Sequence, residues 1–121
     1  MLKRDNPYTA LNRLFHEPNR LAIISALCNS EDGMTFHDLK EECGLTDGNL
    51  SRHLKSLQEA RIIRIKKSFV KAKPQTTVFL TERGREHFVT YLEALEEVLL
   101  KAAESVSTAD LPVNLQKLVR A

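Results

Sequence analysis

Apolar residues in the first half of this chain recur every three or four positions, the period of helices that bury one face. Residues 7–15 predict a short helix, which Pro18 ends because the residue before a proline is pushed out of helical geometry. Pro18 also suits the first turn of a second helix, where no N–H donor is needed. We expect that helix to stop near Asn29, before a polar loop at 30–33, and to bury Leu21, Ile24, Leu27 and Cys28.

Two more short amphipathic helices follow. Thr35 can cap the third helix with Asp38 three residues on, and Gly44 can supply the left-handed residue that ends it. Thr46 caps a fourth helix. The predicted buried stripes are Phe36, Leu39 and Cys43 in the third helix and Leu50, Leu54 and Leu57 in the fourth. Two such helices joined by a glycine-containing turn are typical of a helix-turn-helix.

From Ile62 onward the apolar period changes to two. Ile63 and Ile65 alternate with Arg64 and Lys66, and Val78 and Leu80 alternate with Thr77 and Phe79. Lys71 to Gln75 between these runs predict a turn that contains Pro74. This pattern predicts a β-hairpin with a basic tip.

Thr81 caps a long helix that should run to about Ser105. Its length, roughly 37 Å at 1.5 Å per residue, exceeds what a small domain needs for its own core. The stripe on this helix is spaced as in a helix–helix seam and predicts a dimer interface, although it could instead pack on the chain's own first helices. Its members are Phe88, Tyr91, Leu92, Leu95, Val98, Leu99 and Ala102. Leu111, Leu115 and Leu118 share one face of a weakly amphipathic tail.

Charge is unevenly distributed. The net charge is only +2, yet residues 46–77 hold eight basic and two acidic side chains, and residues 81–105 are net acidic. Such a concentration of positive charge favours an anionic partner. No apolar run is long enough for a membrane span or a secretory signal, and two cysteines fit a reducing compartment, so we expect a cytoplasmic protein.

The polar side of the fourth helix is the candidate binding surface, because its leucines should face inward. In the major groove of DNA, an arginine side chain can hydrogen-bond to both O6 and N7 of guanine, and an asparagine side chain can hydrogen-bond to both N6 and N7 of adenine. Gly48 has no evident folding role there, which suggests close approach of backbone to DNA. The candidate residues are Thr46, Asp47, Asn49, Ser51, Arg52, His53 and Lys55.

Basic side chains of the hairpin suit phosphates or a narrow minor groove. They are Arg64, Lys66, Lys67, Lys71 and Lys73. The alternative is that these lysines only protect an edge strand from aggregation.

Several strings of residues carry a resemblance to a known family. They are Thr35-Phe-His-Asp-Leu-Lys40, Leu45-Thr-Asp-Gly-Asn-Leu-Ser-Arg-His-Leu-Lys55, Ile62-Ile-Arg-Ile and Leu80-Thr-Glu-Arg-Gly84. Over about residues 10 to 100 the chain resembles winged-helix regulators of the MarR/ArsR superfamily, in particular the small single-domain branch. The resemblance implies a homodimer that binds a pseudo-palindromic operator through two recognition helices and two wings. Relatives usually have glycine in place of Arg61, and glycine and arginine at the wing tip where this chain has Ala72.

The predicted fold class is therefore α+β, mainly α: a winged helix-turn-helix domain with a long C-terminal dimerisation helix. We expect a DNA-binding domain at 7–80, the dimerisation helix at 81–105 and a tail at 106–121. The expected function is double-stranded DNA binding as a transcriptional regulator, most simply a repressor, without a membrane partner.

Other functions have weaker support. A winged helix used for protein contacts usually lacks the basic wing, and an RNA binder needs exposed aromatic side chains for stacking. Cys28 and Cys43 could form a redox or metal site, but each lies on an apolar stripe, where cysteine acts as a small hydrophobe. Ser51 and His53 point in different directions on a helix, so they cannot act as a nucleophile and its base, and we expect no catalytic residue. We also expect no cofactor and no metal.

Overall fold

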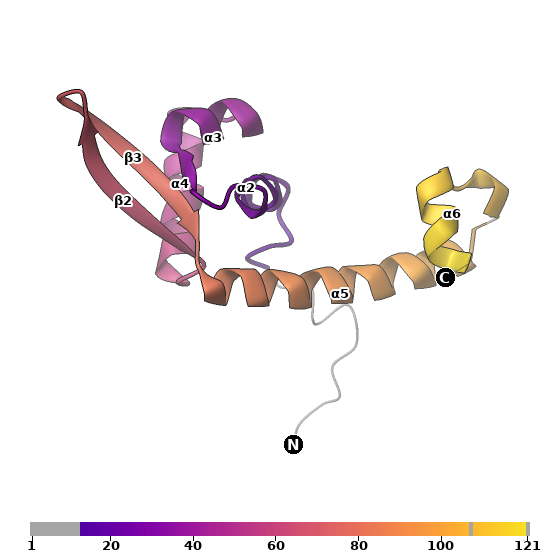
Figure 1. Cartoon of the computed structure of the whole chain (residues 1–121). Helices are drawn as coiled ribbons and strands as arrows, with labels where there is room; N and C mark the ends of the chain where they lie inside the picture. Colours follow the sequence, from indigo (N-terminus) through magenta and orange to yellow (C-terminus); the bar gives the residue numbers. More distant parts are fainter. Residues whose placement is uncertain (1–12, 107, 121) are drawn as a thin grey trace, which may run out of the picture. The chain divides into compact units, whose positions relative to one another are not determined.

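The computed structural model describes residues 13–106 and 108–120 (Figure 1). Its elements, in chain order, are α2 (Pro18–Cys28), β1 (Met34–Thr35), α3 (Phe36–Cys43), α4 (Asp47–Glu59), β2 (Ile63–Val70), β3 (Lys73–Leu80), α5 (Glu82–Glu104), the 3₁₀ turn η1 (Thr108–Asp110) and α6 (Val113–Arg120). The helix predicted at 7–15 lies outside the described residues except for 13–15, which form a turn.

Two compact units divide the chain. One, here called the N-terminal unit, covers residues 12–89, and the C-terminal unit includes residues 90–121. The boundary falls inside α5, so residues 82–89 of that helix belong to the N-terminal unit.

Helix α2 begins and ends where the sequence predicts. Pro18 occupies its first position, and the Glu17 carboxylate accepts hydrogen bonds from the backbone N–H groups of Asn19 (3.1 Å) and Arg20 (2.8 Å). The predicted stripe is only partly right, because Ile23 is fully buried while Leu21 and Cys28 are half-buried. Since α2 contacts both α3 and β3, it buries a different face from the one that periodicity selects.

The helix-turn-helix is confirmed, together with its caps. Thr35 Oγ1 accepts from the N–H of Asp38 at 3.1 Å, and Thr46 Oγ1 accepts from the N–H of Asn49 at 3.2 Å. Gly44 ends α3 with φ of +63°, a conformation that glycine adopts without strain. The fully buried leucines that join the two helices to the core are Leu39, Leu50 and Leu57.

The hairpin forms as predicted, but its strands are longer. The sheet order is β1-β3-β2 and both pairings are antiparallel, with Ile63 opposite Leu80 and Val70 opposite Lys73. The turn is therefore only Lys71 and Ala72, and Pro74 lies in β3 opposite Phe69. Proline is tolerated there because β1 pairs only with Thr77 and Val78, which leaves β3 an edge beside Pro74. A two-residue strand such as β1 is too short for periodicity to reveal.

Thr81 connects the hairpin to α5 and caps the helix as predicted. Its hydroxyl accepts from the N–H of Gly84 at 2.9 Å and lies 2.8 Å from the carbonyl oxygen of Arg61. Gly84 packs so closely that a Cβ there would collide with the Ile62 carbonyl. This glycine therefore allows α5 to lie directly against the start of the hairpin.

Phe88 belongs to the core of the N-terminal unit, which corrects its assignment to an exposed dimer stripe. Its side chain is buried, and its ring centroid lies 5.5 Å from that of Phe15, which is also buried. Aromatic rings at this separation attract each other beyond the area they bury. The alternative weighed from sequence, packing on the chain's own helices, is right at this position.

The C-terminal unit joins the rest of α5 to α6. Leu111, Leu115 and Leu118 share one face as predicted and line an apolar pocket with side chains of α5 that include Leu99 and Ala103. Within the described residues, no helix combines the length and the hydropathy that crossing a membrane requires.

Candidate nucleic-acid interface

The outer face of α4 is polar and exposed from its first residue. The leucines opposite are buried, so this helix presents two chemically distinct sides. The exposed side chains predicted to contact DNA are Thr46, Asp47, Asn49, Ser51, Arg52 and Lys55. Helices of this kind place their N-terminal residues against base edges in the major groove.

Two of these side chains are hydrogen-bonded to each other. Arg52 Nη2 donates to Asn49 Oδ1 at 3.2 Å, one helical turn apart on the exposed face. Arginine and asparagine are the residues that pair in bidentate fashion with guanine and adenine. The hydrogen bond therefore fixes these two predicted DNA-contacting side chains relative to each other.

Asp47 begins the helix and pairs with α3. Its Oδ1 lies 3.0 Å from Lys40 Nζ, although the Asp47 side chain remains 74% exposed. A carboxylate at a helix N-terminus is stabilised by the helix dipole. The Lys40 ammonium offsets the negative charge of this carboxylate.

His53 does not face outward, so its prediction as a base-reading residue is wrong. Only 6% of this residue is exposed, and its Nδ1 lies 3.2 Å from Arg20 Nη1 and 3.8 Å from Glu17 Oε2. Its spacing from Leu50 and Leu57, three and four residues, places it on the buried face. That spacing was the signal in the sequence that could have shown its burial.

The surroundings of His53 favour its neutral form. Burial lowers its pKa below 6.5 and the Arg20 and Arg52 guanidiniums lower it further, while the Glu17 carboxylate opposes them. Burial raises the pKa of Glu17, but hydrogen bonds from the backbone N–H groups of Arg20 and Asn19, together with the nearby positive charge, bring it below its ordinary value. His53 therefore joins α2 to α4 as a neutral, buried side chain.

The hairpin is uniformly basic. Residues 63–80 hold five basic and no acidic side chains. Arg64 stacks over the Phe79 ring, with its guanidinium carbon 4.5 Å from the ring centroid, whereas Lys71 and Lys73 stand at the exposed tip. No described carboxylate forms an ion pair with a hairpin lysine. These cations remain available to an anionic partner.

The helix and the hairpin meet at a shallow hollow. Ser51, Lys55 and Gln58 of α4 line it together with Lys67 of β2 and Thr76 of β3. Gln58 was not among the predicted residues, although it lies one turn beyond Lys55 on the same helical face. The structure thus brings the two predicted binding surfaces into one.

Neither cysteine forms a disulfide. Cys28 and Cys43 are free and half-buried, and burial raises the pKa of both thiols, which lowers their reactivity as thiolates. Within residues 13–106 and 108–120, no cluster of three or more potential metal-ligating side chains occurs.

The predicted dimer stripe is only partly exposed in the single chain. Tyr91 is 1% exposed, and Leu95 and Val98 are half-buried. Leu92, Leu99 and Ala102 remain exposed on α5. Tyr91, like Phe88, is thus already covered within one chain. Leu92, Leu99 and Ala102 each keep exposed apolar area in the C-terminal unit, where Leu99 and Ala102 also line the pocket against α6.

These elements define a winged helix: a helix-turn-helix followed by a β-hairpin. The family model for the winged helix DNA-binding domain matches residues 19–99, and the chain belongs to this family. The family is described as a DNA-binding domain, and the solved structures that share the fold include a MarR-family transcriptional regulator from Silicibacter pomeroyi.

Individual proteins resemble this chain to different degrees. A protein of unknown function from Methanocaldococcus jannaschii is 38% identical over 80 residues, which are 66% of this chain and 86% of that protein. A transcriptional regulator homologue from Pyrococcus horikoshii is 25% identical, with a TM-score of 0.69 over 76% of this chain and 91% of its own. The regulator MosR of Mycobacterium tuberculosis, solved in complex with DNA, shares the fold at 18% identity, with a TM-score of 0.64 over 94% and 80% of the two chains.

Proposed function

We propose that this protein is a homodimeric transcriptional repressor that places α4 in the major groove of duplex DNA and lays the β2–β3 hairpin along the adjacent minor groove. The observation that carries the proposal is the continuous surface formed by Ser51, Lys55 and Gln58 of α4 with Lys67 of β2. The exposed polar face of α4 suits hydrogen bonding to base edges, and the adjoining hairpin, which has no acidic residue, suits the negative charge of the phosphates.

Roles divide between base readout and phosphate contact. Asn49 and Arg52 lie on the exposed face near the start of α4 and suit base edges, with Thr46, Asp47, Ser51 and Lys55 around them. The hairpin cations Arg64, Lys66, Lys67, Lys71 and Lys73 suit phosphates and the minor groove. His53 lies on the buried face of α4 and contacts Arg20 of α2.

Dimerisation belongs to the proposal because one half-site rarely discriminates against a genome of competing sites. The exposed apolar surface of Leu92, Leu99 and Ala102 is the proposed seam. A dimer bound across an operator excludes other proteins from that stretch, which is the basis for proposing repression. In this scheme residues 7–80 bind DNA, 81–105 dimerise and 106–121 form a tail, and the protein acts on the chromosome in the cytoplasm.

Selection of bound duplexes from a random pool tests the proposal directly. We expect an enriched pseudo-palindrome with half-sites about one helical turn apart, and an affinity that falls steeply with salt because phosphate contacts release counterions. A winged helix devoted to protein contacts would bind no duplex even at low ionic strength. Inserting the enriched site into a promoter should reduce transcription in vitro on addition of the protein.

The dimer has its own test. Leu99→Glu places a charge on the proposed seam, and sedimentation should show a monomer that binds the selected duplex far more weakly, since two linked half-sites bind more tightly than one. Val113→Glu is the matched control, because Val113 is an exposed apolar residue of α6, 66% exposed. If both variants sedimented with the same mass and bound the selected duplex with the same affinity, the dimer interface would lie elsewhere on the chain.

A further inference from the structure

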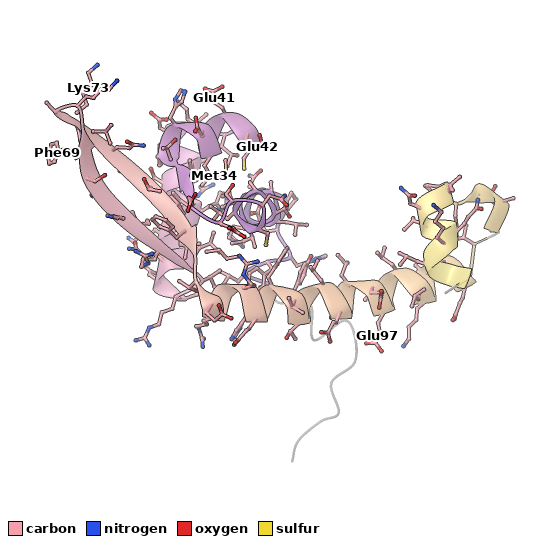
Figure 2. All side chains as sticks on the ribbon, viewed as in Figure 1. Met34, Glu41, Glu42, Phe69, Lys73 and Glu97 are labelled. Atoms are coloured by element: carbon pink, nitrogen blue, oxygen red, sulfur yellow. The ribbon has the colours of Figure 1, made fainter. Side chains whose placement is uncertain are left out.

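The tip of the hairpin exposes an aromatic ring. Phe69 near the end of β2 is 77% exposed, the largest exposed fraction among the large hydrophobic side chains of the described residues. Figure 2 shows Phe69 and Lys73 projecting from the end of the hairpin, clear of the helices. A ring this exposed gives nothing to the core, and neither base readout by α4 nor phosphate binding by lysines requires it.

The hairpin holds Phe69 in a defined position. Val70 pairs with Lys73, and the two turn residues between them, Lys71 and Ala72, have φ of +52° and +65°. Positive φ at both central residues is the pattern of a type I′ turn, which matches the twist of the flanking strands. Phe69 lies directly opposite Pro74 in this register, so two stiff apolar side chains share one face of the tip.

Charge around the ring limits the class of partner. Lys67 precedes Phe69 by two residues on the same face of β2, and Lys71 in the turn and Lys73 at the start of β3 follow it. An occupant of this tip must therefore be anionic at its edges and apolar between them. Stacked base pairs enclosed by two phosphate backbones have that arrangement, whereas a protein surface would need acidic residues around an apolar pocket.

We infer that Phe69, backed by Pro74, is a wedge that enters the minor groove and partly unstacks one base step while the neighbouring lysines hold the phosphates. Minor-groove proteins insert apolar side chains in this way and bend the duplex toward the major groove. Pyrimidine–purine steps unstack most easily, so the wedge adds sequence preference at a position that α4 does not touch. This inference rests on the proposed function and extends it to DNA shape.

The experiment compares Phe69→Ala with Lys73→Ala on the duplex obtained by selection. Loss of one base–aromatic contact should weaken binding by Phe69→Ala roughly 5- to 150-fold and abolish the bend, measured by energy transfer between dyes at the duplex ends. Its salt dependence should match that of the wild type, because no phosphate contact is lost. Lys73→Ala should keep the bend and lower the salt slope by about one.

Two further variants complete the design. Phe69→Leu should restore part of the bend, since leucine also acts as a wedge. Val113→Ala removes an exposed apolar side chain of α6 and should change neither affinity nor bend. Thermal melts check that each variant folds, which is expected because Phe69 is exposed.

The outcomes separate the wedge from the proposed function. Wild-type affinity and bending in Phe69→Ala would overturn the wedge and leave DNA binding by α4 intact, with the tip then available for a protein contact. Failure of the wild type to bind any duplex at low ionic strength would instead defeat the proposed function, and the wedge with it.

Discussion

Replacing Gly48 with alanine separates folding from DNA binding through a single methyl group. Gly48 is the second residue of α4, and the described glycines with positive φ are Gly33 and Gly44 only, so its backbone suits any residue. A Cβ built at Gly48 meets nothing within 4 Å. Alanine exceeds glycine in helix propensity, and Gly48→Ala should raise the free energy of unfolding by about 0.5–1 kcal/mol.

The same methyl group should weaken DNA binding. In the proposed complex the start of α4 lies against the groove, and an added methyl group at a close backbone approach costs about 1–3 kcal/mol. That cost corresponds to a roughly 5- to 150-fold weaker Kd. Denaturant unfolding and fluorescence anisotropy on the same preparation measure the two effects.

Gly84→Ala is the matched control, because it is also a helical glycine but lies against backbone. Alanine there gains about 1 kcal/mol of propensity, yet its Cβ would collide with the Ile62 carbonyl. Overpacking against backbone costs about 1–3 kcal/mol or more, so this variant should be destabilised. If Gly48→Ala raised the free energy of unfolding but left the affinity for DNA unchanged, the close approach of α4 to DNA would be refuted.

Three further predictions concern the interface and its support. Arg52→Ala should cost roughly 1–3 kcal/mol on the selected duplex and relax preference at one base position, measured by competition among single-base variants. Lys71→Ala should weaken binding to all sequences alike and lower the salt slope by about one, so identical profiles for these two variants would contradict the division of roles. Burial holds the pKa of His53 below 6.5, so the unfolded chain takes up a proton first, and the free energy of unfolding should fall as pH drops through 6.5 toward the folded pKa. The difference between wild type and His53→Gln in denaturant unfolding isolates this component; a pH-independent difference would show that His53 remains equally protonated in both states.

Local chemistry was readable from the sequence alone. Thr35, Thr46 and Gly44 cap their helices as expected, because a cap depends on the side chain and backbone of a few adjacent residues. Arg61 takes the left-handed conformation, with φ of +63°, at the position where the sequence resemblance led us to expect glycine. The apolar period of two predicted the hairpin, and a count of charged residues revealed the basic stretch at 46–77.

Tertiary packing decided which side of each helix meets another element. His53 and Phe88 lie at helical positions that could serve either the surface or the core, and contacts with Arg20 and Phe15, far away in the sequence, place both in the core. Phe69 has the same residue type as Phe88 but projects from a hairpin tip, where its side chain stays 77% exposed. Periodicity defines the faces of an element, whereas burial depends on what lies opposite each face, and that is a property of the folded chain.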